Sequence, residues 1–145
     1  MSMQDQRIVE VVRHDPRYMY EAYEFVLDAL NFTQKTLGRS PLAESVTDPG
    51  PEHHVSGREL LAGAVELARR EFGLLARLVF RQWGIHRTDD IGELVFNLID
   101  SHLLSKTDSD TRADFHNVFD LDKTLTEGFT IPLDEIGLSR QGGRR

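Results

Sequence analysis

Two groups of residues in this chain have side chains that could do chemistry. Asp120 and Asp122 are separated by one residue in the segment Val118-Phe119-Asp120-Leu121-Asp122-Lys123-Thr124, and six histidines are scattered along the chain. A carboxylate can attack phosphorus when Mg²⁺ offsets the clustered negative charge, and an Asp–His pair can transfer protons. Phosphoryl transfer and acid–base catalysis are therefore the chemistries to weigh against structural roles.

The aspartate segment resembles the first motif of haloacid-dehalogenase-type phosphatases. The resemblance implies a nucleophile at Asp120 and a general acid at Asp122, where the first strand of a doubly wound sheet ends. Only 21 residues follow Thr124, whereas one βαβ unit needs roughly 30. We therefore predict that both aspartates are structural, in a turn or as helix caps. A small phosphatase-like enzyme that uses Asp120 and Asp122 remains an alternative.

The histidines favour neither a metal site nor a catalytic centre. No two are four residues apart, and the metalloprotease pattern H-E-x-x-H does not occur. His102 could pair with Asp100 or Asp108, although a histidine that interacts with a helix C-terminus is the simpler interpretation. The chain also lacks cysteine and the glycine-rich phosphate-binding motifs. We predict no metal, no cofactor and no catalytic residue. The histidines are His14, His53, His54, His86, His102 and His116.

Three consecutive amphipathic helices are predicted between Ser56 and Lys106. Ser56-Gly57-Arg58-Glu59 is a capping box for the first, Gly73 interrupts the pattern, and Gly84 is placed to end the second in a left-handed conformation. Thr88 could cap the third. No single helix could bury its apolar face alone, so we expect one shared core. The expected apolar faces are Leu60, Leu61, Ala64, Val65, Ala68 and Phe72; Leu74, Leu75, Leu78, Val79 and Trp83; and Ile91, Leu94, Val95, Leu98, Ile99 and Leu103.

Two further helices are expected before this stretch. The first spans residues 3–14. Asp15-Pro16 has the composition of a helix start, and the second helix should run to about Leu37, with Gly38 as its stop. It carries two apolar faces, which indicates a central position in the domain or partial contact with a second copy in a homodimer. The two faces are Met19, Ala22, Tyr23, Val26, Leu30 and Thr33; and Tyr18, Phe25, Ala29 and Phe32.

The remaining segments predict loops and ends. Prolines, a glycine and scattered acids in residues 39–55 indicate a flexible loop, and residues 136–145 indicate a frayed tail. Residues 107–110 should form a turn or a cap, and residues 111–119 a short helix or a strand. The expected fold is therefore mainly α, a single domain over residues 1–145 with about five or six helices.

A winged-helix arrangement of residues 57–121 is one form that this fold could take. The second and third helices have helix-turn-helix proportions, and residues 104–121 could supply the wing strands. A DNA-reading helix needs Arg, Lys, Asn or Gln pointing outward near its N-terminus. Asp89, Asp90 and Glu93 occupy that position here. Phosphate repulsion would weaken every contact, so the sequence disfavours DNA binding through this helix.

Charge and hydropathy narrow the classes of function. The formal net charge is −7, and residues 56–106 are balanced, with seven basic and seven acidic side chains. An acidic protein has no general attraction to nucleic acid or to anionic lipid. No basic-then-apolar N-terminal segment resembles a signal peptide, and no apolar run is long enough to span a membrane. We expect a cytoplasmic protein that does not bind membranes.

Several motifs resemble a family of short, uncharacterised bacterial proteins from planctomycetes and their relatives. The resemblance covers residues 13–122 and implies a stand-alone cytoplasmic domain. It brings no activity, cofactor or catalytic residue. The motifs are Asp15-Pro16-Arg17-Tyr18, Ser56-Gly57-Arg58-Glu59-Leu60-Leu61, Phe72-Gly73, Trp83-Gly84-Ile85, Asp89-Asp90-Ile91-Gly92-Glu93-Leu94-Val95-Phe96-Asn97-Leu98, Leu103-Leu104-Ser105-Lys106-Thr107, and Asp114-Phe115 to Phe119-Asp120.

The surface expected to carry function contains Trp83, Phe96 and Asn97. Phe96 and Asn97 lie off the apolar face of their helix, and Trp83 closes the preceding helix, so the three could meet near the intervening turn. Aromatic side chains often dominate the binding energy of interfaces, which makes an exposed Phe96 a candidate partner site. The alternative is that the loop at residues 39–55 covers Phe96.

The leading hypothesis is a non-enzymatic interaction module, an adaptor or a regulator, that binds an unidentified protein partner. Gly92, inside the third helix, costs about 1 kcal/mol relative to alanine, and close approach of another helix would explain it. A nucleic-acid- or ribosome-associated factor is the alternative function. Arginines gathered on one connected face would favour that alternative. The arginines in question are Arg58, Arg69, Arg70, Arg77, Arg81 and Arg87.

Overall fold

The computed structural model describes residues 2–38, 54–105 and 111–126, and within these ranges the chain forms helices and no strand. The mainly α fold is therefore confirmed. The order of elements is α1 (Met3–His14), α2 (Tyr20–Thr36), α3 (Gly57–Phe72), η2 (Gly73–Leu75), α4 (Ala76–Trp83), α5 (Thr88–Asp100), η3 (Arg112–Phe115) and α6 (Leu121–Thr126), where η2 and η3 are 3-10 helices.

The proposed wing is wrong for the part of it that is described. Residues 104–105 and 111–121 contain the 3-10 helix η3 and turns, and no strand. The turn expected at residues 107–110 and the tail expected at residues 136–145 lie outside the described residues. The same holds for the loop expected at residues 39–55, apart from its last two positions. Among the described helices, none combines the length and apolarity needed to cross a membrane.

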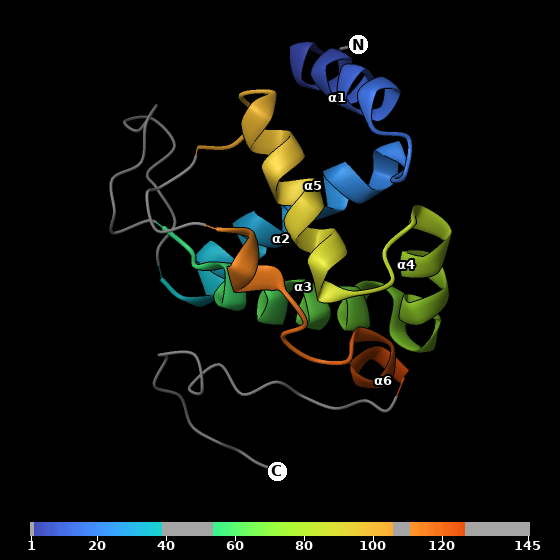
Figure 1. Ribbon diagram of the computed structural model, residues 1–145. Coiled ribbons are helices and arrows are strands. Elements are labelled where there is room, and N and C mark those ends of the chain that lie inside the picture. Colours follow the sequence, from blue (N-terminus) through green and yellow to red (C-terminus); the bar gives the residue numbers. More distant parts are fainter. Residues whose placement is uncertain (1, 39–53, 106–110, 127–145) are drawn as a thin grey trace.

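Helix α2 is the centre of the molecule, as its two apolar faces predicted. It packs most extensively on α3 and also contacts α5, α1 and α4. Figure 1 shows α2 behind α5, with α3 crossing below and α4 to one side. Tyr23 and Phe25 point to different sides of α2, and both are buried. The sandwiched position therefore accounts for both faces within one chain.

The start of α2 differs from the prediction at Asp15-Pro16. Asp15 ends α1, and its backbone N–H donates to the carbonyl oxygen of Val11 at 2.9 Å. The chain then turns, and α2 begins only at Tyr20. The carboxylate of Asp15 accepts from the guanidinium of Arg17 at 2.8 and 2.7 Å instead of capping a helix. An Asp-Pro pair is compatible with a turn as well as with a helix start, and the local ion pair favours the turn here.

The capping box at the start of α3 is confirmed. The Glu59 backbone N–H donates to Ser56 Oγ at 3.1 Å, and the Ser56 backbone N–H donates to Glu59 Oε1 at 2.9 Å. Farther along the helix, a Cβ atom at Gly63 would overlap Thr33 Oγ1 of α2. A glycine at this position therefore lets the two helices approach closely. The expected face of α3, from Leu60 to Ala68, is buried.

The expected apolar face of the next helix is wrong. Leu74, Leu75 and Leu78 are 93%, 60% and 55% exposed, whereas Ala76 and Phe80 are buried. The cause is Gly73, which adopts a positive φ of 55° and leads into the 3-10 helix η2. Each residue of a helix turns by about 100°, so an irregular turn before α4 changes which side chains face the core. Gly84 ends α4 in the left-handed conformation, as predicted.

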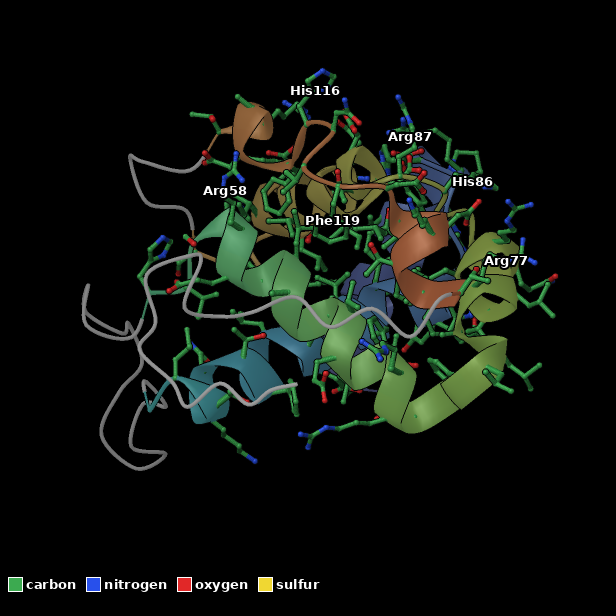
Figure 2. All side chains as sticks on the ribbon, turned by 90° about the horizontal axis from the view of Figure 1, so that it is seen from below. Arg58, Arg77, His86, Arg87, His116 and Phe119 are labelled. Atoms are coloured by element: carbon green, nitrogen blue, oxygen red, sulfur yellow. The ribbon has the colours of Figure 1, made fainter. Side chains whose placement is uncertain are left out.

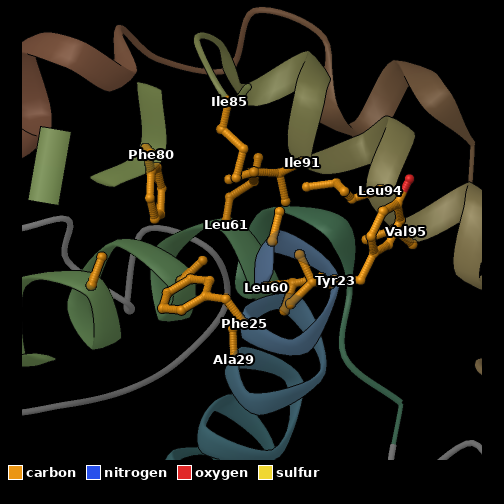
Figure 3. Packing of buried hydrophobic residues seen from close by; sticks show 14 of the residues in the cluster. Tyr23, Phe25, Ala29, Leu60, Leu61, Phe80, Ile85, Ile91, Leu94 and Val95 are labelled. Atoms are coloured by element: carbon orange, nitrogen blue, oxygen red, sulfur yellow. The ribbon is translucent and has the colours of Figure 1, made fainter. Parts of the chain in front are cut away.

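The core face of α5 is confirmed, and its cap is not. Ile91, Leu94 and Leu98 are buried, and Figure 3 shows Ile91 and Leu94 packed among side chains of α2, α3 and α4. Thr88, expected as the cap, is the first residue of α5, and its buried hydroxyl donates to the carbonyl oxygen of Phe115 at 2.7 Å. Gly92 is explained by close packing, as expected: a Cβ atom there would lie 2.6 Å from Phe115 Cβ.

Candidate functional site

Phe96, the candidate partner aromatic, is buried rather than exposed. Only 8% of it is accessible. Its ring meets the ring of Phe115 edge-on, with 6.2 Å between centroids, and the guanidinium of Arg112 lies 5.0 Å from its centroid. The expectation that Phe96 is exposed is therefore wrong. The segment around η3, which follows α5 in the chain, supplies the side chains that cover it.

Trp83 belongs to an aromatic cluster formed by α2, α3 and α4. Its ring centroid lies 5.5 Å from that of Phe25, 5.7 Å from that of Phe72 and 6.0 Å from that of Phe80. The side chain is half-buried, so most of its contacts are internal. Its backbone carbonyl oxygen accepts from the Met19 N–H at 3.1 Å, which ties the end of α4 to the start of α2.

Asn97 is a hydrogen-bonding junction. Its amide nitrogen donates to Asp15 Oδ2 at 2.9 Å and lies 3.0 Å from the hydroxyl of Tyr23. Trp83, Phe96 and Asn97 therefore face three separate sets of neighbours, and they do not form the single exposed surface that the sequence suggested. Their expected contact with a partner stays a prediction.

A polar network surrounds this junction. Arg17 pairs with Asp15 and also reaches Glu93 at 3.3 Å, and Arg112 pairs with the other oxygen of Glu93 at 2.9 Å. Arg17 holds the pKa of Asp15 well below its ordinary value, and Asn97 lowers that pKa further. The network connects the α1–α2 turn to α5 and η3, so its geometry serves to fix these elements.

Tyr18 extends the network into the core. Its hydroxyl donates to Asp90 Oδ1 at 2.6 Å. Burial raises the pKa of the Tyr18 hydroxyl, and the hydrogen bond to Asp90 raises it further. The other oxygen of Asp90 accepts the backbone N–H groups of His86 and Arg87 at 2.8 and 3.0 Å. Asp90 therefore stabilises the turn before α5 while it satisfies a buried hydroxyl.

His116 and Asp89 form a pair that the sequence did not suggest. His116 Nδ1 lies 2.6 Å from Asp89 Oδ2, and Asp89 Oδ1 accepts the Asn117 N–H at 3.0 Å. Burial raises the pKa of Asp89, but these two hydrogen bonds outweigh that effect and the net shift is downward. The two residues are 27 positions apart, so no local motif could reveal the pair. They line an open depression of about 300 Å³ together with Gly92, Glu93, Arg112 and Ala113.

The pair has the geometry of a proton-transfer dyad, and it lies on an exposed surface among groups that already have partners. The side chain of His116 is 71% exposed, and Arg112, in the same depression, is already paired with Glu93. In the described ranges, no group of three or more His, Asp or Glu side chains is placed to hold a metal ion. Asp89 also anchors the turn after η3 through the Asn117 N–H, which is a sufficient reason for its position.

Asp120 and Asp122 have structural partners. Asp120 Oδ1 accepts the Lys123 backbone N–H at 3.0 Å, as a helix cap at the start of α6 would. Asp122 forms an ion pair with Arg81 of α4. His102, the other candidate, adopts a left-handed φ of 66° after α5, and its carbonyl oxygen lies 3.5 Å from Arg7 Nη1. The described structure therefore brings neither aspartate together with a histidine.

Among the described residues, a group of exposed leucines stands out where α3 is followed by α4. We call Leu74, Leu75 and Leu78 the leucine corner. They are the most exposed large apolar side chains of the described residues apart from Met3. The sequence pattern assigned all three to the core, so it could not reveal this surface. The sequence contains one sign of this surface: the charged residues Arg77 and Arg81 stand close to the leucines along the chain.

The arginines near the corner do not extend into one basic face. Arg70 pairs with Glu66 at 2.9 Å, and Arg81 pairs with Asp122. Figure 2 places Arg58 and Arg77 on different sides of the molecule, near opposite ends of α3. Helix α3 has 16 residues and is about 24 Å long; Arg58 is in its first turn, whereas Arg77 follows its other end in α4. Arg58 and Arg77 therefore do not lie side by side, and a nucleic-acid-associated factor stays an untested alternative.

The fold and the corner define an all-helical protein with an apolar surface feature. Comparisons with known proteins add no identity: no model of a protein family matches the chain, and neither a curated protein nor a solved structure matches it.

Proposed function

We propose that this protein is a non-enzymatic interaction module that binds a protein partner through the leucine corner. The observation that carries the proposal is the exposure of Leu74, Leu75 and Leu78, at 93%, 60% and 55%. Complete burial of a leucine side chain is worth about 1.5–3 kcal/mol. Three neighbouring leucines left in water therefore offer a partner a substantial gain in free energy.

The neighbours of the corner support recognition of a protein. Arg77 lies between Leu75 and Leu78 and forms no ion pair with another described residue. Arginine is enriched among the residues that dominate protein–protein binding energy, and an apolar centre with a polar rim is the usual composition of an interface. By contrast, the candidate catalytic groups at Asp120, Asp122 and His116 are engaged with structural partners.

The test is Leu75→Glu in the full chain, compared with Met3→Glu, whose position in α1 is 68% exposed. Both sites are exposed, so neither substitution should change the free energy of unfolding by more than about 1 kcal/mol. Native pull-downs analysed by quantitative mass spectrometry should lose one specific partner with Leu75→Glu and keep it with Met3→Glu.

Two results would contradict the proposal. If Leu75→Glu unfolds the protein, the corner is part of the core. If both variants capture the same proteins in the same amounts as the unmodified chain, the leucine corner is not a binding surface. Leu78→Glu provides an independent second position, because it lies one helical turn away on α4.

A further inference from the structure

We propose that residues 127–138 of this same chain bind the leucine corner and compete there with the partner. This proposal rests on the proposed function of the leucine corner. It adds that the C-terminal segment occupies the corner, so a partner must displace this segment in order to bind. Three observations support it, namely the composition of the segment, the place where α6 ends, and the position of the corner relative to the other long segment outside the described residues.

The composition of residues 127–138 complements the corner. The segment reads Glu-Gly-Phe-Thr-Ile-Pro-Leu-Asp-Glu-Ile-Gly-Leu, with five large apolar residues, three acidic residues and no basic residue. Apolar side chains at this density favour burial against another apolar surface. The acidic residues can meet the guanidinium of Arg77, which no described carboxylate neutralises. The two surfaces therefore match in both apolar character and charge.

The segment begins beside the corner. Helix α6 packs against α4, and its Asp122 forms an ion pair with Arg81. Leu78 precedes Arg81 by three residues in α4, and residues three apart lie on the same face of a helix. Figure 1 shows α6 below α4, and the helix ends at Thr126. An extended chain covers about 3.3–3.6 Å per residue, so the length of residues 127–138 allows a span of about 40 Å from the end of α6.

The other segment outside the described residues is less well placed. Residues 39–53 connect α2 to α3 and lead into the N-terminal end of α3 at Ser56. The leucine corner follows the opposite end of this helix of 16 residues, about 24 Å away. The C-terminal segment is therefore the occupant that the geometry favours.

A pair of engineered cysteines can test this directly, because the chain contains no native cysteine. The variant is Leu78→Cys with Ile131→Cys in the full chain, and the control is Met3→Cys with Ile131→Cys. Disulfides form only when the two Cα atoms come within about 4.4–6.8 Å. Mild oxidation should give a monomer with an internal disulfide in the first variant, and several-fold less of it in the control. Non-reducing electrophoresis and peptide mass spectrometry distinguish the products.

Other outcomes would overturn the proposal. A disulfide-linked dimer as the main product means that a second copy supplies the occupant. Equal internal disulfide in both variants, or none in either, means that residues 127–138 do not prefer the corner. Far-UV circular dichroism checks that each variant is folded.

A second measurement does not depend on disulfide formation. In Leu75→Cys, modification by a maleimide should be several-fold slower than in the same protein carrying Ile131→Asp and Leu133→Asp. Equal rates would overturn the proposal. The same aspartate substitutions, placed in the natural background, should increase capture of the partner. If the labelling rate rises but no partner is captured by any variant, the intramolecular contact stands and the proposed function fails, so the two ideas are separable.

Discussion

The amide of Asn97 joins three parts of the molecule. It donates to Asp15 at the end of α1 and lies within hydrogen-bonding distance of Tyr23 in α2, while its own backbone belongs to α5. A buried polar group without a partner costs about 1–3 kcal/mol. Without this amide, the Asp15 carboxylate would keep Arg17 as a partner, whereas the buried Tyr23 hydroxyl would lose its hydrogen bond to Asn97.

We expect Asn97→Leu to lower the free energy of unfolding by about 1–3 kcal/mol, because it keeps the approximate volume but removes the donor. Urea denaturation measures the change. The control is Asn31→Leu, the same substitution at an exposed position of α2, which should change stability by less than about 0.5 kcal/mol. Equal changes at the two positions would mean that the hydrogen bonds of Asn97 contribute nothing to the free energy of unfolding.

Asp15 should make the free energy of unfolding depend on pH in the acid range. Its folded-state pKa lies below the ordinary value of 3.8 because Arg17 and Asn97 stabilise the carboxylate. The unfolded chain therefore binds this proton more readily, and the carboxylate stabilises the fold above about pH 4. As the pH falls through the unfolded value toward the folded one, that contribution disappears.

The corresponding variant is Asp15→Asn. At pH 7 it should be less stable than the natural chain by about 1 kcal/mol, a modest value because solvent screens the exposed Arg17 partner. The difference should shrink when urea denaturation is repeated at decreasing pH below 4. Asp28→Asn, at an exposed position of α2, is the control. A difference that stays constant with pH would show that ionisation of Asp15 is not coupled to folding.

At the scale of elements, the long helices were predictable and the short one was not. The capping box of Ser56 and Glu59 predicts the start of α3. The helical spacing of Ile91, Leu94 and Leu98 predicts the core face of α5. Such a pattern needs several turns to be unambiguous. Helix α4 has only eight residues, and Leu74 and Leu75 just before it, together with Leu78, are more hydrophobic than the small Ala76 that faces the core. Hydrophobicity alone therefore selected the wrong face.

Long-range contacts explain what else the sequence missed. The aromatic face of Phe96 is covered by Phe115, and His116 meets Asp89, although 27 residues separate the members of that second pair. Neither contact follows from helical periodicity, because both depend on where η3 returns after residues 106–110. Gly92 was the one local sign of this packing, since a glycine within a helix favours close approach by another element.

The orientation of α4, which leaves Leu78 exposed, predicts different effects for the same substitution at a buried and at an exposed leucine. Leu98→Ala should lower the free energy of unfolding by about 2–5 kcal/mol, because the side chain is completely buried in α5. The identical substitution Leu78→Ala removes a side chain that is 55% exposed, and its cost should stay below about 1 kcal/mol. Urea denaturation of the two variants checks both values. Similar losses would show that Leu78 is buried and that the leucine corner does not exist in solution.

For the molecule as a whole, α2 links two distinct groups of side chains. The aromatic cluster at one end contains Phe25 of α2 with Phe72, Phe80 and Trp83. Tyr23, two residues away on the same helix, approaches Asn97 in the polar network. A single rigid helix that contributes to both groups should couple them, since neither can lose its contacts without disturbing α2.

This coupling predicts one cooperative unfolding transition. Trp83 is the only tryptophan of the chain, so its fluorescence reports the aromatic cluster, whereas far-UV circular dichroism reports all helices. The two signals should change at the same urea concentration, as expected for a small two-state domain. In Asn97→Leu, both midpoints should shift together, although the substitution lies in the polar network and not in the cluster. A Trp83 midpoint that stays fixed while the dichroism midpoint falls would show that α3 and α4 unfold independently of α5, and that the chain contains two cooperative units instead of one domain.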